Sequence, residues 1–222
     1  MTIGCLYIVS TPIGNYADIS LRALETMREA DAIVCEEYRQ GSTLLKRLEI
    51  PRKELLLLNE HNETEQADEL LKGLLQGKTL ALISDCGTPA FADPGTKLIR
   101  LAHQFQVPVV PVPGASSLMA IISVSPYPLE EFYFAGFLPR KSEARQARWT
   151  QLSRLNVPII LMDTPYRLGK LLQEVRSVFS KSRLLTLAID MTMPGELILH
   201  GMVEEIQRQV GERKGEFMLV IH

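Results

Sequence analysis

Cysteine is scarce in this sequence. The three cysteines, Cys5, Cys35 and Cys86, are odd in number, lie far apart and form no C-x-x-C pair. This pattern argues against a disulfide framework and against a zinc site, and it favours a reducing compartment. His61, in the motif "NEHNE", also lacks the spacing of standard metal ligands. We therefore expect a cytoplasmic protein that holds no metal.

An excess of positive charge is missing as well. The chain carries 24 Lys and Arg against 26 Asp and Glu, which gives a formal net charge of −2. No overall field would draw such a protein to nucleic acid, so an RNA partner would need a local basic patch.

A membrane span is not predicted. Residues 104–129 contain no charged residue and are long enough to cross a bilayer. However, Pro108, Pro111, Pro113 and Gly114 interrupt this stretch, where a membrane helix would need continuous hydrogen bonding. The first residues also lack the basic start of a signal peptide. We expect a buried strand, a turn and a buried helix here, and no membrane partner.

The first half of the chain alternates between apolar runs and helical patterns. The apolar runs, which are typical of strands, lie at residues 6–10, 32–37, 54–59, 78–84 and 107–112. Helical patterns separate them, the first expected from a cap at Asp18 to about Ala30. Strands separated by helices of this length predict an α/β fold with a parallel sheet.

The second half has a different order of elements. Strands are expected at residues 132–138, 157–163, 184–190, 196–203 and 215–221, and helices at 141–155, 167–179 and 204–211. Three strands gathered near the end predict a mixed or antiparallel sheet. We place the domain border after Pro113, with "SPYP" at 125–128 as the alternative linker. This gives an N-terminal α/β domain over 1–113 and a C-terminal α/β domain over 114–222.

Three turns rich in Gly and Pro follow predicted strands of the first half. They are "STPIGN" (10–15), "SDCGTPAFADPG" (84–95) and "PVPGASS" (111–117). Ligands of open α/β sheets bind beyond the carboxyl ends of strands, so the three turns could line one crevice. None of them contains G-x-G-x-x-G or G-x-x-x-x-G-K-[ST], so the sequence supports neither a standard dinucleotide fold nor a P-loop.

These turns, taken with "ADISLRAL", "NEHNE", "GFLPRK" and "KGEFMLVI", resemble the tetrapyrrole methylase family in order and over nearly the whole chain. Within that family the sequence is most similar to the branch that methylates ribosomal RNA of the small subunit. The resemblance implies two α/β domains with S-adenosylmethionine bound in the cleft between them, and usually a homodimer. The family uses its own loops for this cofactor, consistent with the absence of G-x-G-x-x-G.

The resemblance also implies which residues contact the cofactor. They are Pro12, Gly14, Ser84, Asp85, Gly87, Thr88, Phe91, Ala92, Ser116, Ser117, Met162, Asp163, Asp190 and Pro194. Structural roles remain open for several of them. Asp85 could cap its turn, Ser116 and Ser117 could cap the helix that follows, and Met162 could be a core residue.

On the substrate side, three motifs depart from the pattern of the RNA branch. "EEYR" (36–39) stands for Glu-Asp-Thr-Arg, and "DTPYR" (163–167) stands for Glu-Ser-Pro-His-Arg, so Tyr166 replaces a His. In "AIDMTMPGE" (188–196), Ile189 and Met193 replace two basic residues. Fewer cations mean fewer phosphate contacts. Two other activities therefore stay open. One is C-methylation of a tetrapyrrole, disfavoured by Thr88 where that branch has Asp, and the other is non-catalytic cofactor binding.

One basic run remains as an RNA-binding candidate. Lys141, Arg145 and Arg148 are spaced i, i+4 and i+7, which places them on one face of a predicted helix. This face could hold an RNA backbone, or it could simply be solvated. Arg39 and Arg167 are further candidates for binding phosphate or a developing oxyanion.

The expected reaction is methyl transfer from S-adenosylmethionine to a ribose 2′-hydroxyl of ribosomal RNA. A hydroxyl is a weak acid, so a base near the acceptor should help. Asp85, Glu37 and His61 are the candidates, and the sequence does not rank them.

Overall fold

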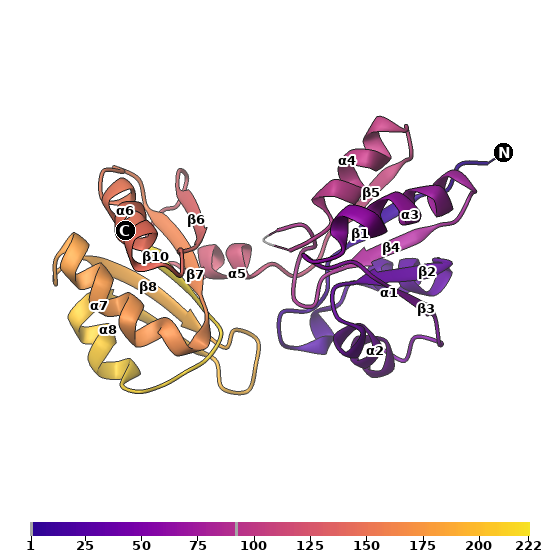
Figure 1. Ribbon diagram of the computed structural model, residues 1–222. Coiled ribbons are helices and arrows are strands. Elements are labelled where there is room, and N and C mark those ends of the chain that lie inside the picture. The colour runs from indigo at the N-terminus through magenta and orange to yellow at the C-terminus, as the bar shows by residue number, and fades with distance from the viewer. Residues whose placement is uncertain (1, 92) are drawn as a thin grey trace. The chain divides into compact units, whose positions relative to one another are not determined.

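The computed structural model describes residues 2–91 and 93–222, so Ala92, a predicted cofactor contact, lies outside the described residues. The chain forms two compact units that separate between Ser116 and Ser117. The sequence places the border after Pro113, three residues earlier. We describe each unit by itself (Figure 1).

The first unit is built on a parallel sheet. Its strands are β1 (Leu6–Val9), β2 (Ala32–Cys35), β3 (Glu54–Leu57), β4 (Leu80–Ile83) and β5 (Val109–Val112). They lie in the order β3-β2-β4-β1-β5, and every pairing is parallel. The central strands β2 and β4 are buried at every residue, as expected where helices cover both faces. The prediction of a parallel N-terminal sheet is confirmed.

Two pairs of helices cover the two faces of this sheet. They are α1 (Leu21–Glu29) and α2 (Tyr38–Arg47) on one face, and α3 (Glu63–Leu75) and α4 (Thr96–Gln104) on the other. Each pair closes its own apolar core. The predicted cap at Asp18 is wrong, because Asp18 belongs to a short 3-10 turn, Tyr16–Asp18. Ser20 begins α1 instead, and its hydroxyl accepts the Ala23 N–H at 3.1 Å.

The connections of the first unit define a place for a ligand. From β1 the chain runs through α1 to β2, whereas from β4 it runs through α4 to β5 on the opposite face. The neighbouring carboxyl ends of β1 and β4 are therefore a topological switch point, where loops diverge and open sheets bind ligands.

The second unit is a mixed sheet, which confirms the prediction. Its strands are β6 (Tyr133–Phe137), β7 (Ile159–Asp163), β8 (Leu184–Ile189), β9 (Leu197–Met202) and β10 (Phe217–Ile221). They lie in the order β6-β7-β10-β8-β9, with β6 and β7 parallel and the other pairs antiparallel. Phe217 pairs with both Asp163 and Ile189, and Ile189 pairs with Leu197, so the ends of four strands share one edge.

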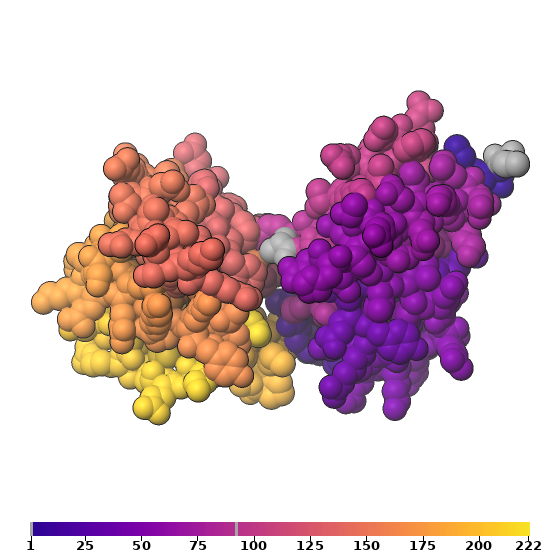
Figure 2. Space-filling view, viewed as in Figure 1, coloured from indigo at the N-terminus to yellow at the C-terminus, as the bar shows by residue number. Residues whose placement is uncertain are grey.

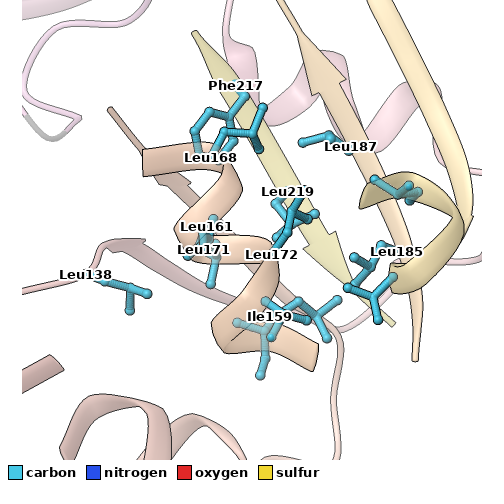
Figure 3. Close-up of a cluster of buried hydrophobic side chains, with 14 of the residues drawn as sticks. Leu138, Ile159, Leu161, Leu168, Leu171, Leu172, Leu185, Leu187, Phe217 and Leu219 are labelled. Atoms are coloured by element: carbon cyan, nitrogen blue, oxygen red, sulfur yellow. The ribbon is translucent and has the colours of Figure 1, made fainter. Parts of the chain in front are cut away.

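Helices cover both faces of this second sheet. One face packs against α6 (Ser142–Leu152), α7 (Leu168–Phe179) and α8 (Val203–Val210), and Figure 3 shows the leucines that fill this core. The other face packs against α5 (Ser117–Ser123). Figure 2 shows the outward sides of α6 and α7 in orange tones. Among the described residues, no helix is long and apolar enough to span a membrane.

Candidate active site

The three predicted loops of the first unit are joined by hydrogen bonds at the switch point. The Thr11 N–H donates to the Gly87 carbonyl at 2.8 Å, and the Thr11 hydroxyl donates to the Ser84 carbonyl at 2.9 Å. The Thr88 hydroxyl donates to the Ala115 carbonyl at 3.3 Å. The loops after β1, β4 and β5 thus form one connected backbone assembly. Sequence reasoning missed Thr11, which is buried and makes two of these contacts.

This assembly leaves little room for a side chain at Gly87. Its φ is +85°, and an added Cβ would lie 3.3 Å from Cγ2 of Ile13. A left-handed backbone without a side chain lets a ligand approach the main chain closely. Pro12 is buried and Gly14 half-buried in the neighbouring loop. The loop at Gly87 is therefore shaped by its backbone conformation, with no side chain to keep a ligand away from the main chain.

Ser84 fixes the start of the long loop after β4. Its hydroxyl donates to Oδ2 of Asp93 at 2.5 Å and accepts the Cys86 N–H at 3.0 Å. Asp93 therefore closes this loop and does not cap α4. Glu63 supplies that cap, because its Oε1 accepts the N–H groups of Gly95 and Lys97 at 2.9 and 3.0 Å. The only sequence signal for Glu63 was its place at the end of "NEHNE".

Several carboxylates gather at the same edge of the sheet. Burial raises the pKa of Asp85, and the negative charge of Glu37 raises it further, while the Glu37 N–H donates a hydrogen bond to Asp85 that acts in the opposite direction. Burial, followed by the charge of Asp85, also raises the pKa of Glu36. Burial raises the pKa of Asp93 too. Raised carboxyl pKa values are common at sites of proton transfer. Sequence reasoning missed Glu36 and Asp93.

The other candidates of the first unit lie in different settings. His61 has an 85% exposed side chain, and its Nε2 is 3.5 Å from Oε1 of Glu60, which is also exposed. Arg39 is exposed in the first turn of α2. Phe91 and Ser116 are half-buried, and Ser117 begins α5 in the second unit. The structure therefore groups Asp85 with Glu37 and leaves His61 beside Glu60.

In the second unit, Asp163 ends β7 and is 2% exposed. Its Oδ2 accepts a hydrogen bond from Nη1 of Arg145 at 3.0 Å, and its Oδ1 lies 3.4 Å from Nη1 of Arg167. Oδ1 also accepts the Thr164 N–H at 2.8 Å. The carboxylate is therefore fully engaged within the unit. Met162 is half-buried and packs against the core that α5 covers.

The structure corrects the prediction that Arg145 lies on an exposed phosphate-binding stripe. Arg145 is 4% exposed, and its guanidinium also lies 2.8 Å from Glu174. The sequence spacing fits two overlapping stripes. One is the predicted exposed stripe, and the other consists of Arg145, Trp149 and Leu152. In the structure the second stripe forms the buried face of α6. A buried cation between two carboxylates has no access to an RNA backbone.

Lys141 and Arg148 are consequently not partners of Arg145 on one surface. Lys141 precedes the first turn of α6 and is exposed. Arg148 donates to the Tyr133 hydroxyl at 2.9 Å, and Tyr133 begins β6. Because β6 runs parallel to β7, Tyr133 lies at the edge of the sheet opposite to Asp163. The two remaining cations therefore sit near opposite edges of the second sheet.

Asp190 and Pro194 lie in the loop after β8, at the same edge as Asp163. Oδ1 of Asp190 accepts the Glu216 N–H at 3.0 Å, and Oδ2 lies 3.4 Å from Nη2 of Arg213. Pro194 is exposed. Asp190 thus ties the loop before β10 to the loop after β8.

The sequence matches the family described as Tetrapyrrole (Corrin/Porphyrin) Methylases over residues 5–207. This chain belongs to the tetrapyrrole methylase family. Proteins of this family are methyltransferases, and the chain is therefore an enzyme of that class. The resemblance seen in the sequence motifs is confirmed.

Similar proteins within this family share one name, ribosomal RNA small subunit methyltransferase I. The protein from Neisseria meningitidis serogroup A is 41% identical, over 99% of this chain and 76% of its own length. The protein from Escherichia coli O157:H7 is 37% identical, over 98% of this chain and 77% of its own length. The protein from Leptospira biflexa is 34% identical, over 99% of this chain and 91% of its own length.

Solved structures of the family share the fold. A uroporphyrin-III C-methyltransferase from Thermus thermophilus has a TM-score of 0.68 and 17% identity, and it covers 99% of this chain and 98% of its own. A cobalt-precorrin-4 methyltransferase has a TM-score of 0.67 and 20% identity, over 97% and 93% of the two chains. In the part of the chain that the structure describes, no three His, Cys, Asp or Glu side chains are grouped to hold a metal.

Proposed function

We propose that this enzyme transfers a methyl group from S-adenosylmethionine to a ribose 2′-hydroxyl of small-subunit ribosomal RNA. The observation that carries the proposal is the 34–41% identity, along almost the whole chain, to proteins named for that RNA. Such an acceptor would place the protein in the cytoplasm, where ribosomal subunits assemble.

The loops of the first unit are the proposed cofactor site. When bound, S-adenosylmethionine supplies an activated methyl group on a sulfonium. The main chain around Gly87, held by Thr11 and by Thr88, would cradle the nucleoside. Pro12, Gly14, Phe91 and the Ser116 turn would complete the contacts. Asp163 and Asp190 have a structural role in this proposal and do not bind the cofactor through their carboxylates, because both carboxylates already pair with arginines.

Asp85 is the proposed general base. It is an exposed residue directly after Ser84, at the switch point, so an acceptor hydroxyl could reach its carboxylate. A carboxyl group with a raised pKa binds a proton more tightly and is a stronger base once ionised. Glu37 is a positioning residue here, since its N–H orients the Asp85 carboxylate and its charge raises the pKa. Arg39, in the first turn of α2, would hold an RNA phosphate.

C-methylation of a tetrapyrrole is the weaker alternative. The structures named for such substrates are only 17–20% identical, which shows the fold alone. Thr88 stands where the tetrapyrrole branch has an Asp, and its hydroxyl is engaged with Ser10 and Ala115. Binding without catalysis is the other alternative, and the raised pKa of Asp85 favours catalysis over it.

Methyl incorporation tests the proposal. Small ribosomal subunits from a bacterial strain that lacks the corresponding methyltransferase would be incubated with the protein and tritiated S-adenosylmethionine. We expect label in the RNA that survives alkali as a 2′-O-methylated nucleotide, at least about a hundredfold less with Asp85→Asn. Calorimetry should show that Asp85→Asn still binds S-adenosylhomocysteine. Binding of the cofactor by the parent without any label in RNA would reject the RNA acceptor.

A further inference from the structure

Tyr166 is the most exposed large apolar side chain that the structure describes, at 80%. It lies in a 3-10 turn, Pro165–Arg167, directly after β7. An aromatic ring in water forgoes the free energy of burial, so a ring presented in this way is a candidate contact for a ligand.

The turn that carries Tyr166 is rigidly held from behind. Asp163 accepts the Thr164 N–H, and the Thr164 carbonyl accepts the Arg167 N–H at 2.9 Å. Arg145, buried inside the unit, fixes the Asp163 carboxylate at 3.0 Å. A ring on an ordered turn loses little conformational entropy when it binds a partner. The buried ion pair therefore presents Tyr166 in a preorganised position.

One cation lies over the Tyr166 ring and another is its neighbour in sequence. Nζ of Lys214 lies 5.4 Å from the centroid of the Tyr166 ring. The loop of Lys214 is anchored by Arg213, which pairs with Asp190 and donates to the Gly195 carbonyl. Arg167 follows Tyr166 in the same turn, and its side chain is 30% exposed while Nη1 lies 3.4 Å from Oδ1 of Asp163. An exposed aromatic ring with cations close to it suits an anionic polymer with planar groups better than an apolar protein surface.

We infer that Tyr166 stacks on an unpaired nucleobase of the RNA acceptor, while Lys214 and Arg167 hold phosphates beside that base. This inference rests on the proposed function and names a subsite of it. Every base has a π-face, so stacking tolerates many sequences, and phosphate contacts fix the position of the strand. Duplex RNA keeps its bases stacked inside the helix, so the subsite selects single-stranded or extruded nucleotides.

The decisive measurement is binding of a fluorescein-labelled single-stranded RNA and of the same RNA annealed to its complement. Tyr166→Ala should weaken binding of the single strand by about tenfold to a hundredfold and leave binding of the duplex almost unchanged. Tyr166→Phe keeps the ring and should bind like the parent. Phe105→Ala is the matched control, because Phe105 is also an exposed aromatic residue, at 46%, and lies in the first unit.

Lys214 is tested by the salt dependence of the same binding. Lys214→Ala should reduce the slope of log K against log salt by roughly 0.7, the value for one phosphate of a single strand. Tyr166→Ala should leave this slope unchanged, since the ring carries no charge. Lys181→Ala, which removes an exposed lysine before β8, is the control.

The outcomes separate this inference from the proposed function. If the parent binds and methylates RNA but Tyr166→Ala binds the single strand as tightly as the parent, the stacking subsite is rejected and the function stands. If Tyr166→Ala weakened binding of the single strand and of the duplex equally, stacking would be rejected as well, and Tyr166 would be a contact that does not distinguish the two. If the parent binds no RNA and labels none, the function fails and the subsite fails with it.

Discussion

Arg145 donates from Nη1 to Oδ2 of Asp163 at 3.0 Å inside the second unit, and both side chains are almost fully buried. Glu174 completes the arrangement by accepting from Nε of Arg145 and from Nε1 of Trp149 at 3.0 Å. Removing one partner of a buried pair leaves an uncompensated charge, whereas an exposed cation can be lost at little cost.

Replacement of Arg145 should therefore cost stability. Arg145→Met is expected to lower the free energy of unfolding by about 3–5 kcal/mol, because the buried Asp163 would lose its nearer cation and the half-buried Glu174 would lose its ion-pair partner. The matched variant Arg148→Met, on the same helix, should change it by less than about 1 kcal/mol. Urea unfolding followed by circular dichroism measures both. Equal stability of Arg145→Met and the parent would show that the cation does not hold these carboxylates.

A side chain at Gly87 should block cofactor binding. Gly87→Val places a β-branched residue at φ +85° and directs its Cβ to within 3.3 Å of Ile13. We expect affinity for S-adenosylhomocysteine to fall by more than about tenfold, since the strained loop and the added bulk both alter the cradle. Gly169→Ala is the control, because an added Cβ there meets nothing within 4 Å. Titration calorimetry that gives Gly87→Val the parent's affinity would contradict the cradle.

Removing the charge of Glu37 should shift the pH dependence of the reaction. The negative charge of Glu37 raises the pKa of Asp85, so Glu37→Gln should lower that pKa and keep the backbone N–H. A base acts when ionised, and the rate therefore rises with pH through its pKa. The acidic limb of kcat/KM against pH should move to lower pH in Glu37→Gln. If the limb stays in place while Asp85→Asn is inactive, the electrostatic link between the two carboxylates is absent.

The half-buried imidazole of His222 should make stability depend on pH. Its Nε2 lies 2.9 Å from the hydroxyl of Thr186, and burial, with the charges of His200 and Arg183, lowers the pKa of His222 to about 4. The unfolded chain takes up this proton near pH 6.5, so the contribution to stability is present above that pH and is lost as pH falls towards 4.

Between pH 7 and pH 5, the free energy of unfolding of His222→Gln should therefore fall less than that of the parent. The slopes of unfolding free energy against pH should differ by up to the value for about one bound proton. Thermal or urea unfolding across this range measures the slope. His103→Gln, which changes an exposed histidine of α4, serves as the control. A parent and His222→Gln with the same slope would mean that His222 titrates alike in the folded and unfolded chains.

A homodimer remains a proposal, and α5 offers a surface for it. Met119 is 55% exposed in the stretch without charges, beside exposed Ser123 on the same helix. Sedimentation at micromolar concentration should show a dimer for the parent and for Ser123→Ala. Met119→Glu should shift the equilibrium towards monomer, because a charge would be buried in the interface. A parent that sediments as a monomer would end this proposal.

Much of the fold could be predicted from local patterns. The runs "LYIVS", "KTLALIS" and "GEFMLVI" are largely apolar and all three form strands, of which β4 and β10 are buried at every residue and β1 at its first and last. A mixed second sheet also followed from the order of its elements. The residue at which a helix begins is less well determined by sequence. Asp18 and Ser20 are both good N-caps, and only the path of the chain after β1 selects Ser20.

The loops that hold the candidate site were visible as clusters of Gly and Pro, but their partners were not. Thr11 joins two loops that lie 73 or more residues apart, and no local signal marks such a pair. Glu63 caps α4 from a distance of more than thirty residues in sequence, because the free N–H groups of Gly95 and Lys97 face the start of α3. The grouping of Asp85 with Glu37 likewise needs β2 and β4 to be neighbours.

By itself, the sequence determined the family, the alternation of strands and helices, and the loops that follow β1, β4 and β5, because these depend on residue type and short spacing. Only the tertiary structure decided which face of α6 is buried. Arg145 fits an exposed stripe with Lys141 and Arg148 as well as it fits a buried stripe with Trp149 and Leu152. Asp163 and Glu174 resolve this ambiguity, since these two carboxylates from other elements offset the cost of removing the Arg145 guanidinium from water.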